Sequence, residues 1–349
     1  MMSDPESSLE PESDAPREPR LGIESFIRRR FLLGVGFGIL ITAAFIVLSV
    51  GSEVLQSLKT FAWRLVPLIL ALSLSNYLLR FIKWHLYLHW VESGAMSKLT
   101  SLLIFMSGLS MAITPGKVGE FLKPYLVRRV NGAAISVTAP IVVAERLTDG
   151  IAILVLAALG LLQIRHGWML LVALGILFVT FTLLIQRRSL IESILRRFEH
   201  IALIGKRAET LERLYESTWK MFRPQKLAIA VAISVVSWAG ECVAFYLIML
   251  GLGFPASAHL LFAAASSLAI ATMIGALSLL PGGLGAAELS ATGLLILFVG
   301  SAHIDHETAA TATLLVRFAT FWFGIALGLI ALLSSDWYLN RINNAASQR

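Results

Sequence analysis

The chain has 349 residues, of which 57% are hydrophobic and only 15% are charged, and its mean hydropathy is +0.77. These values exclude an ordinary soluble domain and indicate a polytopic membrane protein. The formal net charge of +7 does not indicate nucleic-acid binding. In a membrane protein an excess of Lys and Arg sets the topology and meets anionic lipid headgroups.

Residues 1–24 are rich in Pro, Ser, Asp and Glu and predict a disordered acidic tail. From residue 25 to 334 we expect one all-α membrane domain with about six full spans and two re-entrant hairpins. Arg28, Arg29 and Arg30 precede the first apolar run, so the positive-inside rule places the amino terminus in the cytoplasm. The predicted full spans cover residues 31–50, 63–83, 134–163, 167–185, 226–250 and 308–334.

The charge of the connecting segments predicts which of them are cytoplasmic. Residues 186–226 contain ten Lys or Arg, and apolar residues recur in them at helical spacing, which predicts amphipathic helices on the cytoplasmic membrane surface. Arg341 and Arg349 place the tail 335–349 on the same side. The second span should end at the interface with Arg80, Lys83, Trp84 and Tyr87 as anchors. We therefore expect a protein of the inner or plasma membrane with both termini in the cytoplasm.

Two short stretches interrupt the apolar sequence in the same way. LSMAITPGKVGE runs from Leu109 to Glu120, and LSLLPGGLGAAE runs from Leu277 to Glu288. Each contains Pro-Gly, a second Gly four residues after the Pro, and a closing glutamate. Pro and Gly break a helix, and in hydrocarbon such a break is tolerated where it faces protein or a watery cavity. A matched pair of such breaks indicates a transport site.

Three predicted crossings separate the two breaks, so the hairpins should open from opposite sides of the membrane. The halves 31–163 and 167–334 are then expected to be inverted repeats, which is a transporter architecture.

Charged residues inside the predicted spans are the other candidates for function. Glu145, Arg146 and Asp149 lie in one span, where charge is costly and marks a pathway by default. The alternative is a structural ion pair between helices. Arg317 follows the second break as Arg146 follows the first, so we interpret them as repeat partners. Each could bind a lipid phosphate through its guanidinium fork, or bond to hairpin carbonyls instead.

The glycine-rich breaks could present backbone N–H groups to an anion, or serve only to turn the chain. The sequence contains no GxSxG, HExxH or Walker motif, and we expect no cofactor, no metal site and no enzymatic activity. The predicted translocation site comprises Pro115, Gly116, Lys117, Gly119, Glu120, Lys123, Glu145, Arg146, Asp149, Pro281, Gly282, Gly283, Gly285, Glu288 and Arg317, with Arg80 and Glu241 as further single polar residues in two spans.

At PGKVGEFLKPYLVRR, AERLTD and LLPGGLGAAE the sequence resembles the lysylphosphatidylglycerol synthase transmembrane family, over roughly residues 31–334. The resemblance implies a flippase-like membrane domain, with phosphatidylglycerol derivatives or polyprenyl-linked sugars as candidate cargo. The full synthase adds a soluble aminoacyl-transfer domain, for which this chain has no room, so the resemblance implies movement of lipid and not its aminoacylation.

We expect a transporter that moves an anionic phospholipid or a polyprenyl-phosphate lipid between leaflets. Its partners would be membrane lipids and an enzyme of lipid synthesis, not nucleic acid; the sequence does not indicate an oligomeric state. The alternatives are an integral-membrane lipid-linked transferase, whose catalytic loop would have to be the short stretch around Asp305, and a non-transporting scaffold for envelope-lipid enzymes.

Overall fold

The computed structural model describes residues 57–161 and 208–346, together with isolated positions between 36 and 183. The predicted tail 1–24 and the predicted spans 31–50 and 167–185 therefore lie outside the continuously described residues. The described part is all-helical, as expected. Its α-helices are α3 (Val66–Trp90), α4 (Lys98–Ser110), α5 (Leu122–Asn131), α6 (Ile135–Leu161), α10 (Ala208–Met221), α11 (Pro224–Gly251), α12 (Ala258–Leu277), α13 (Ala286–Val299), α14 (His306–Arg317) and α15 (Phe323–Ala346).

Several of these helices are long and apolar enough to cross a membrane. At 1.5 Å per residue, about 20 residues span the hydrocarbon core. Within the described residues, five segments meet this requirement by length and composition: Trp63–Trp90, Pro224–Gly251, Ala258–Leu277, Pro281–Val299 and His306–Ser334. The chain is thus an integral membrane protein with several candidate spans.

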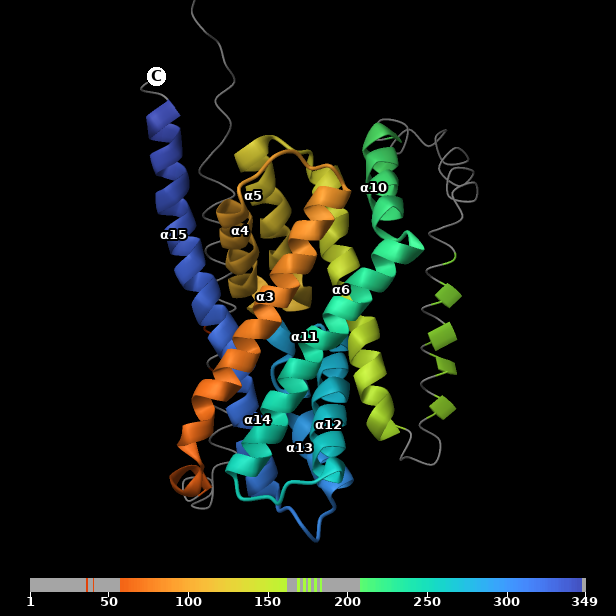
Figure 1. Cartoon of the computed structure of the whole chain (residues 1–349), viewed down its shortest axis with the longest axis vertical. Coiled ribbons are helices and arrows are strands. Elements are labelled where there is room, and N and C mark those ends of the chain that lie inside the picture. Colours follow the sequence, from red (N-terminus) through yellow and green to blue (C-terminus); the bar gives the residue numbers. More distant parts are fainter. Residues whose placement is uncertain are drawn as a thin grey trace, which may run out of the picture.

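Both predicted breaks are present, and their tips meet. The first break is the 3₁₀ segment Pro115–Phe121 between α4 and α5, and the second is Pro281–Gly283 between α12 and α13. The first hairpin enters from the end of the molecule that lies at the top of Figure 1, and the second enters from the opposite end. The Gly116 amide donates to the Leu279 carbonyl at 3.2 Å, which joins the two tips, and both of these residues are exposed.

The limbs of the two hairpins differ in length. Helix α5 has only 10 residues, which is about 15 Å of helix and too short to cross. Helix α12 has 20 residues, which is long enough.

The prediction that the second span ends at the interface near Lys83 is wrong. Helix α3 continues to Trp90, and Lys83, Trp84 and Tyr87 are each no more than 1% exposed. These side chains lie among α4, α5, α6 and α11 and not at a membrane surface. The polar residues that suggested interface anchoring are partners in buried contacts instead.

The last predicted span is a helix with a defect. A π-helical turn, Phe318–Trp322, separates α14 from α15. The hydroxyl of Tyr77 on α3 donates to the Thr320 carbonyl within this turn. Beyond it, Gly324 and Gly328 repeat at the small-xxx-small spacing, and a Cβ at Gly324 would lie 2.9 Å from the Tyr77 hydroxyl. These glycines allow α15 to pack closely on α3 and α4, as α15 and α4 do in Figure 1.

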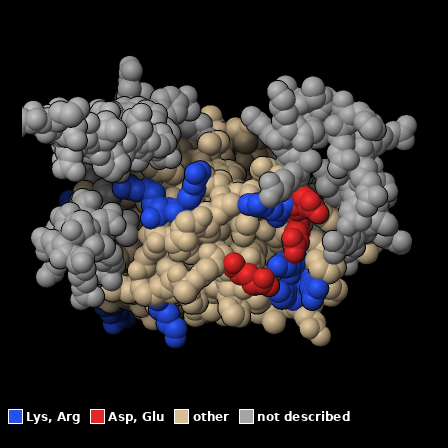
Figure 2. Space-filling view, turned by 90° about the horizontal axis from the view of Figure 1, so that it is seen from above, with Lys and Arg blue, Asp and Glu red and all other residues tan. Residues whose placement is uncertain are grey.

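Residues 208–226 of the predicted amphipathic segment are described, and they include the helix α10. Helix α10 packs on α6 and is followed by Phe222, which is 1% exposed. The ends of α3, α5, α10 and α15 gather at the top of Figure 1. Exposed basic residues, among them Arg128, Arg129 and Arg223, belong to this end, and Figure 2 shows Lys and Arg side chains across it together with a few acids. That this end is cytoplasmic remains a prediction from its charge.

Candidate functional site

A cavity of ≈ 130 Å³ lies where the two hairpin tips meet α3, α6, α11 and α14. A cavity needs about 10–15 Å³ of such volume to hold one water, so this one admits several. Five charged side chains line it, three of them arginines: Arg80, Glu120, Arg146, Glu241 and Arg317. The convergence of both breaks and of these charged side chains makes this cavity the candidate site.

The first arginine pairs with the glutamate that closes the first break. Arg146 Nε lies 2.9 Å and its terminal nitrogen 2.8 Å from Glu120 Oε2. The Arg146 side chain is 30% exposed, whereas that of Glu120 is 5% exposed. Arg146 therefore reaches across from α6 to the break, and it leaves part of its guanidinium open toward the cavity.

The second arginine repeats this arrangement on the other side. Arg317 Nε donates to Glu288 Oε1 at 2.6 Å, and its terminal nitrogen donates to the Gly282 carbonyl at 3.0 Å. Its guanidinium carbon lies 4.3 Å from the centre of the Phe321 ring. Glu288 Oε2 also accepts a bond from the Gly285 amide at 2.6 Å, which caps α13. The contact of Arg317 with a hairpin carbonyl is the alternative that the sequence left open.

Glu145 faces away from the cavity. Its Oε2 accepts from Lys123 Nζ at 2.5 Å, and both side chains are buried. The Lys123 ammonium lies 4.7 Å from the Trp84 ring and 5.4 Å from the Phe105 ring. Neither Glu145 nor Lys123 lines the cavity. For this pair the structure favours the alternative reading, an ion pair that joins α5 to α6.

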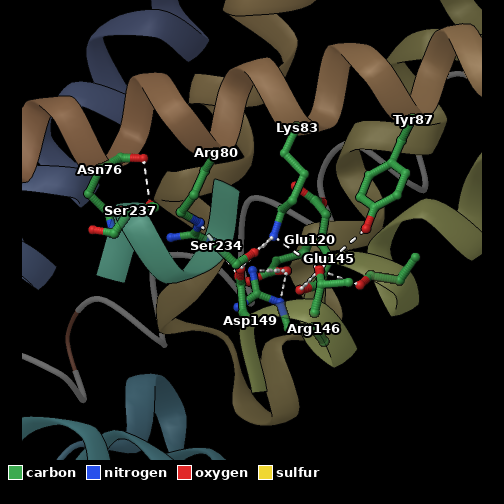
Figure 3. A network of polar contacts seen from close by, with 12 residues as sticks. Asn76, Arg80, Lys83, Tyr87, Glu120, Glu145, Arg146, Asp149, Ser234 and Ser237 are labelled. Carbon is green, nitrogen blue, oxygen red and sulfur yellow. Dashed lines mark hydrogen bonds and ion pairs between the residues drawn. The ribbon is translucent and has the colours of Figure 1, made fainter. Parts of the chain in front are cut away.

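Asp149 belongs to a network that the sequence did not indicate (Figure 3). Lys83 Nζ donates to Asp149 Oδ1 at 2.5 Å, to Ser234 at 2.6 Å and to Thr148 at 3.2 Å. Arg80 and Lys83 leave the same face of α3 toward α6 and α11. Sequence reasoning placed Lys83 at the interface, although its position three residues after Arg80, on the same helix face, was a usable signal.

The break glycines serve mainly to shape the chain. Gly116, Gly282, Gly283 and Gly285 all have positive φ. The described amides bond within the protein: those of Gly116 and Gly283 donate to the carbonyls of Leu279 and Leu280, that of Gly119 to the Thr114 hydroxyl, and that of Gly285 to Glu288. These four N–H groups are thus not open to an anion. For Pro115 and Lys117 the structure describes the backbone alone, while Pro281 begins the second break.

Comparison with known proteins shows the family of this chain. The family described as lysylphosphatidylglycerol synthase TM region matches residues 35–328. A UPF0104 membrane protein of Methanothermobacter thermautotrophicus is 27% identical over 314 residues, which cover 84% of this chain and 90% of that protein. A UPF0104 membrane protein of Methanocaldococcus jannaschii is 24% identical over 224 residues, which cover 63% of this chain and 91% of that protein. The chain belongs to the lysylphosphatidylglycerol synthase transmembrane region family.

Proposed function

We propose that this protein moves an anionic phospholipid or a polyprenyl-phosphate lipid between the leaflets of the membrane, and that it is not an enzyme. The lipid headgroup would pass through the cavity while the acyl chains stay in the bilayer. The observation that carries this proposal is the convergence of three arginines on one cavity at the meeting point of two broken hairpins. Guanidinium groups bind phosphate oxygens in pairs, and charge at membrane depth marks a pathway by default.

An inverted-repeat architecture is part of the proposal. The order α3, α4, break, α5, α6 has a counterpart in α11, α12, break, α13 and α14 with α15. The two sets enter from opposite ends in Figure 1, and in each set an arginine on the helix after the hairpin pairs with the glutamate of its own break. Two equivalent gates around one shared cavity provide the basis for alternating access.

The membrane-embedded transferase is less well supported. Its only candidate catalytic loop was the stretch around Asp305. The carboxylate of Asp305 accepts a bond from the Thr308 amide at 2.6 Å and caps α14, which is a structural role. A scaffold for lipid-synthesis enzymes would not require buried arginines in a cavity.

Reconstitution tests the proposal. Purified protein in liposomes should move a fluorescent anionic phospholipid between leaflets and leave its chemical structure unchanged. Arg317→Lys should lower the rate at least tenfold, because an ammonium cannot keep both the Glu288 and the Gly282 contacts and still bind phosphate bidentately. Arg64→Lys, an exposed arginine outside the cavity, is the matched control and should keep the parent rate. Chemical conversion of the lipid, or no movement by the parent protein, would refute the proposal.

A further inference from the structure

Within the described part of the chain, Arg80 is the arginine of the cavity that has no hydrogen-bonded partner. It projects from the middle of α3, lines the cavity and is only 8% exposed. Its nearest acid is Asp149, with 3.6 Å between Arg80 Nε and Asp149 Oδ2, which is too long for a hydrogen bond. Both of these atoms are buried without a hydrogen-bond partner, and no described residue accepts a bond from the other guanidinium nitrogens of Arg80.

The other cations in the interior of the described protein are bonded differently. Each donates to a carboxylate oxygen within 2.9 Å: Lys83 to Asp149, Lys123 to Glu145, Arg146 to Glu120, and Arg317 to Glu288. A buried charge whose N–H groups lack acceptors costs free energy of folding. Such a group therefore indicates a site where a bound ligand supplies the missing acceptors. Arg80 differs from these four cations because its nearest carboxylate oxygen lies 3.6 Å away.

Asp149 holds Arg80 in place without using up its donors. One carboxylate oxygen, Oδ1, accepts from Lys83 at 2.5 Å and from Ser234 at 3.0 Å. The other, Oδ2, faces Arg80 at ion-pair distance. On another side the guanidinium carbon of Arg80 lies 5.9 Å from the centre of the Trp238 ring. The acid therefore compensates part of the charge of Arg80, while its hydrogen-bonding fork stays available to the cavity.

We infer that Arg80 is the primary anion-binding residue of the cavity, and that its ligand is a phosphate group bound through two parallel N–H···O bonds. The sequence analysis instead named Arg146 and Arg317 as the phosphate-binding candidates and Arg80 only as a further polar residue. Arg146 and Arg317 are engaged by Glu120 and Glu288 and act as the two gates beside the binding residue. That the phosphate belongs to a lipid headgroup, and not to a free anion, rests on the proposed function.

Binding measurements on the full chain in detergent test the inference separately from transport. The probes are short-chain phosphatidylglycerol and inorganic phosphate, each titrated calorimetrically into the parent protein and into Arg80→Gln. Arg80→Gln should weaken binding of the short-chain lipid about 10- to 100-fold, the effect of losing charge-assisted hydrogen bonds. Arg80→Lys, which keeps the charge without the fork, should weaken it less. Arg64→Gln, at an exposed arginine, should bind like the parent.

The binding results for the Arg80 variants support or overturn the inference as follows. Parent-like affinity in Arg80→Gln, or a parent protein that binds neither probe, would overturn the inference. If Arg80→Gln does not fold, Arg80→Lys is the test variant. Binding of the short-chain lipid by Arg80→Lys as tightly as by the parent would exclude a role for the guanidinium fork. Equal affinity for free phosphate and lipid would support the phosphate site and contradict a lipid source. If Arg80→Gln loses binding but the parent moves no lipid in liposomes, the phosphate site at Arg80 is supported and the proposed function fails. If the parent moves lipid, and Arg80→Gln binds and moves it equally well, the proposed function is supported and the phosphate site at Arg80 is excluded.

Discussion

Asn76 and Ser237 exchange two hydrogen bonds where α3 crosses α11. The Asn76 side-chain amide donates to the Ser237 carbonyl at 3.0 Å, and the Ser237 hydroxyl donates to the Asn76 carbonyl at 3.1 Å. Such reciprocity is expected of two elements related by a local two-fold axis. One turn further along each helix lie Arg80 and Glu241, which both line the cavity. The crossing therefore fixes where these two charged side chains enter the site.

Removal of this reciprocal contact should destabilise the protein measurably. We expect Ser237→Ala to lower the free energy of unfolding by about 0.5–1.5 kcal/mol and Asn76→Ala by about 1–3 kcal/mol, because Asn76 is fully buried and its loss leaves space. The double variant should lose less than the sum. Thermal unfolding in detergent measures this. Ser75→Ala, at the exposed neighbour of Asn76, is the control, and an equal loss there would contradict the assignment.

Lys123 and Glu145 should depend on each other for stability and not for lipid binding. Lys123→Met leaves the Glu145 carboxylate buried without its partner, which costs about 3–5 kcal/mol. Adding Glu145→Gln removes the stranded charge and should restore most of the stability. Because neither residue lines the cavity, the double variant should bind short-chain phosphatidylglycerol like the parent. Recovered stability with lost binding would assign this pair to the site instead.

The glycines four residues after each proline should resist substitution for two different reasons. A Cβ at Gly119 would lie 2.7 Å from the Thr114 side chain and 2.9 Å from Met111 Cβ, so Gly119→Ala should displace the first break. Gly285 has φ +84°, so Gly285→Ala should cost of order 1 kcal/mol or more in backbone strain.

Lipid movement in liposomes and thermal unfolding in detergent measure both glycine effects. We expect slow transport and a lowered unfolding temperature in each variant. Val118→Ala, at an exposed position in the first break, is the matched control and should change neither. Parent-like transport in all three variants would mean that the shape of the breaks does not matter for function.

The two hairpins should open to opposite sides of the membrane. Because the two tips contact each other, cysteines at the turns would not tell the two faces of the membrane apart, and cysteines are better placed before each hairpin. In a Cys242→Ser background, Ala95→Cys and Ala256→Cys should react with an impermeant thiol reagent from opposite faces of the membrane. Both positions are exposed, and they belong to the α3–α4 and α11–α12 connections, which lie at opposite ends of Figure 1. Leu289→Cys, an exposed apolar position within α13, should stay unlabelled. Labelling of the first two from one face would exclude inverted repeats.

The sequence by itself determined where the chain is apolar, where it breaks and which residues correspond. Pro, Gly and runs of apolar residues act locally, so the segments around Pro115 and Pro281 and the described spans follow from short windows. The equivalence of Arg146 and Arg317 also followed from their spacing to the breaks. In the structure the two arginines pair with equivalent residues, Glu120 and Glu288. The sequence analysis did not predict these partners.

Only the tertiary structure decided which acidic side chain pairs with which basic one. Neighbouring residues on a helix point about 100° apart, so Glu145 and Arg146, although adjacent in sequence, face different elements. Glu145 bonds to Lys123, Arg146 to Glu120, and Asp149 to Lys83. These partners come from three other elements, and their choice depends on how each helix is rotated against its neighbours. For the same reason the sequence could not show that Arg80 lines the cavity without a hydrogen bond to any described residue.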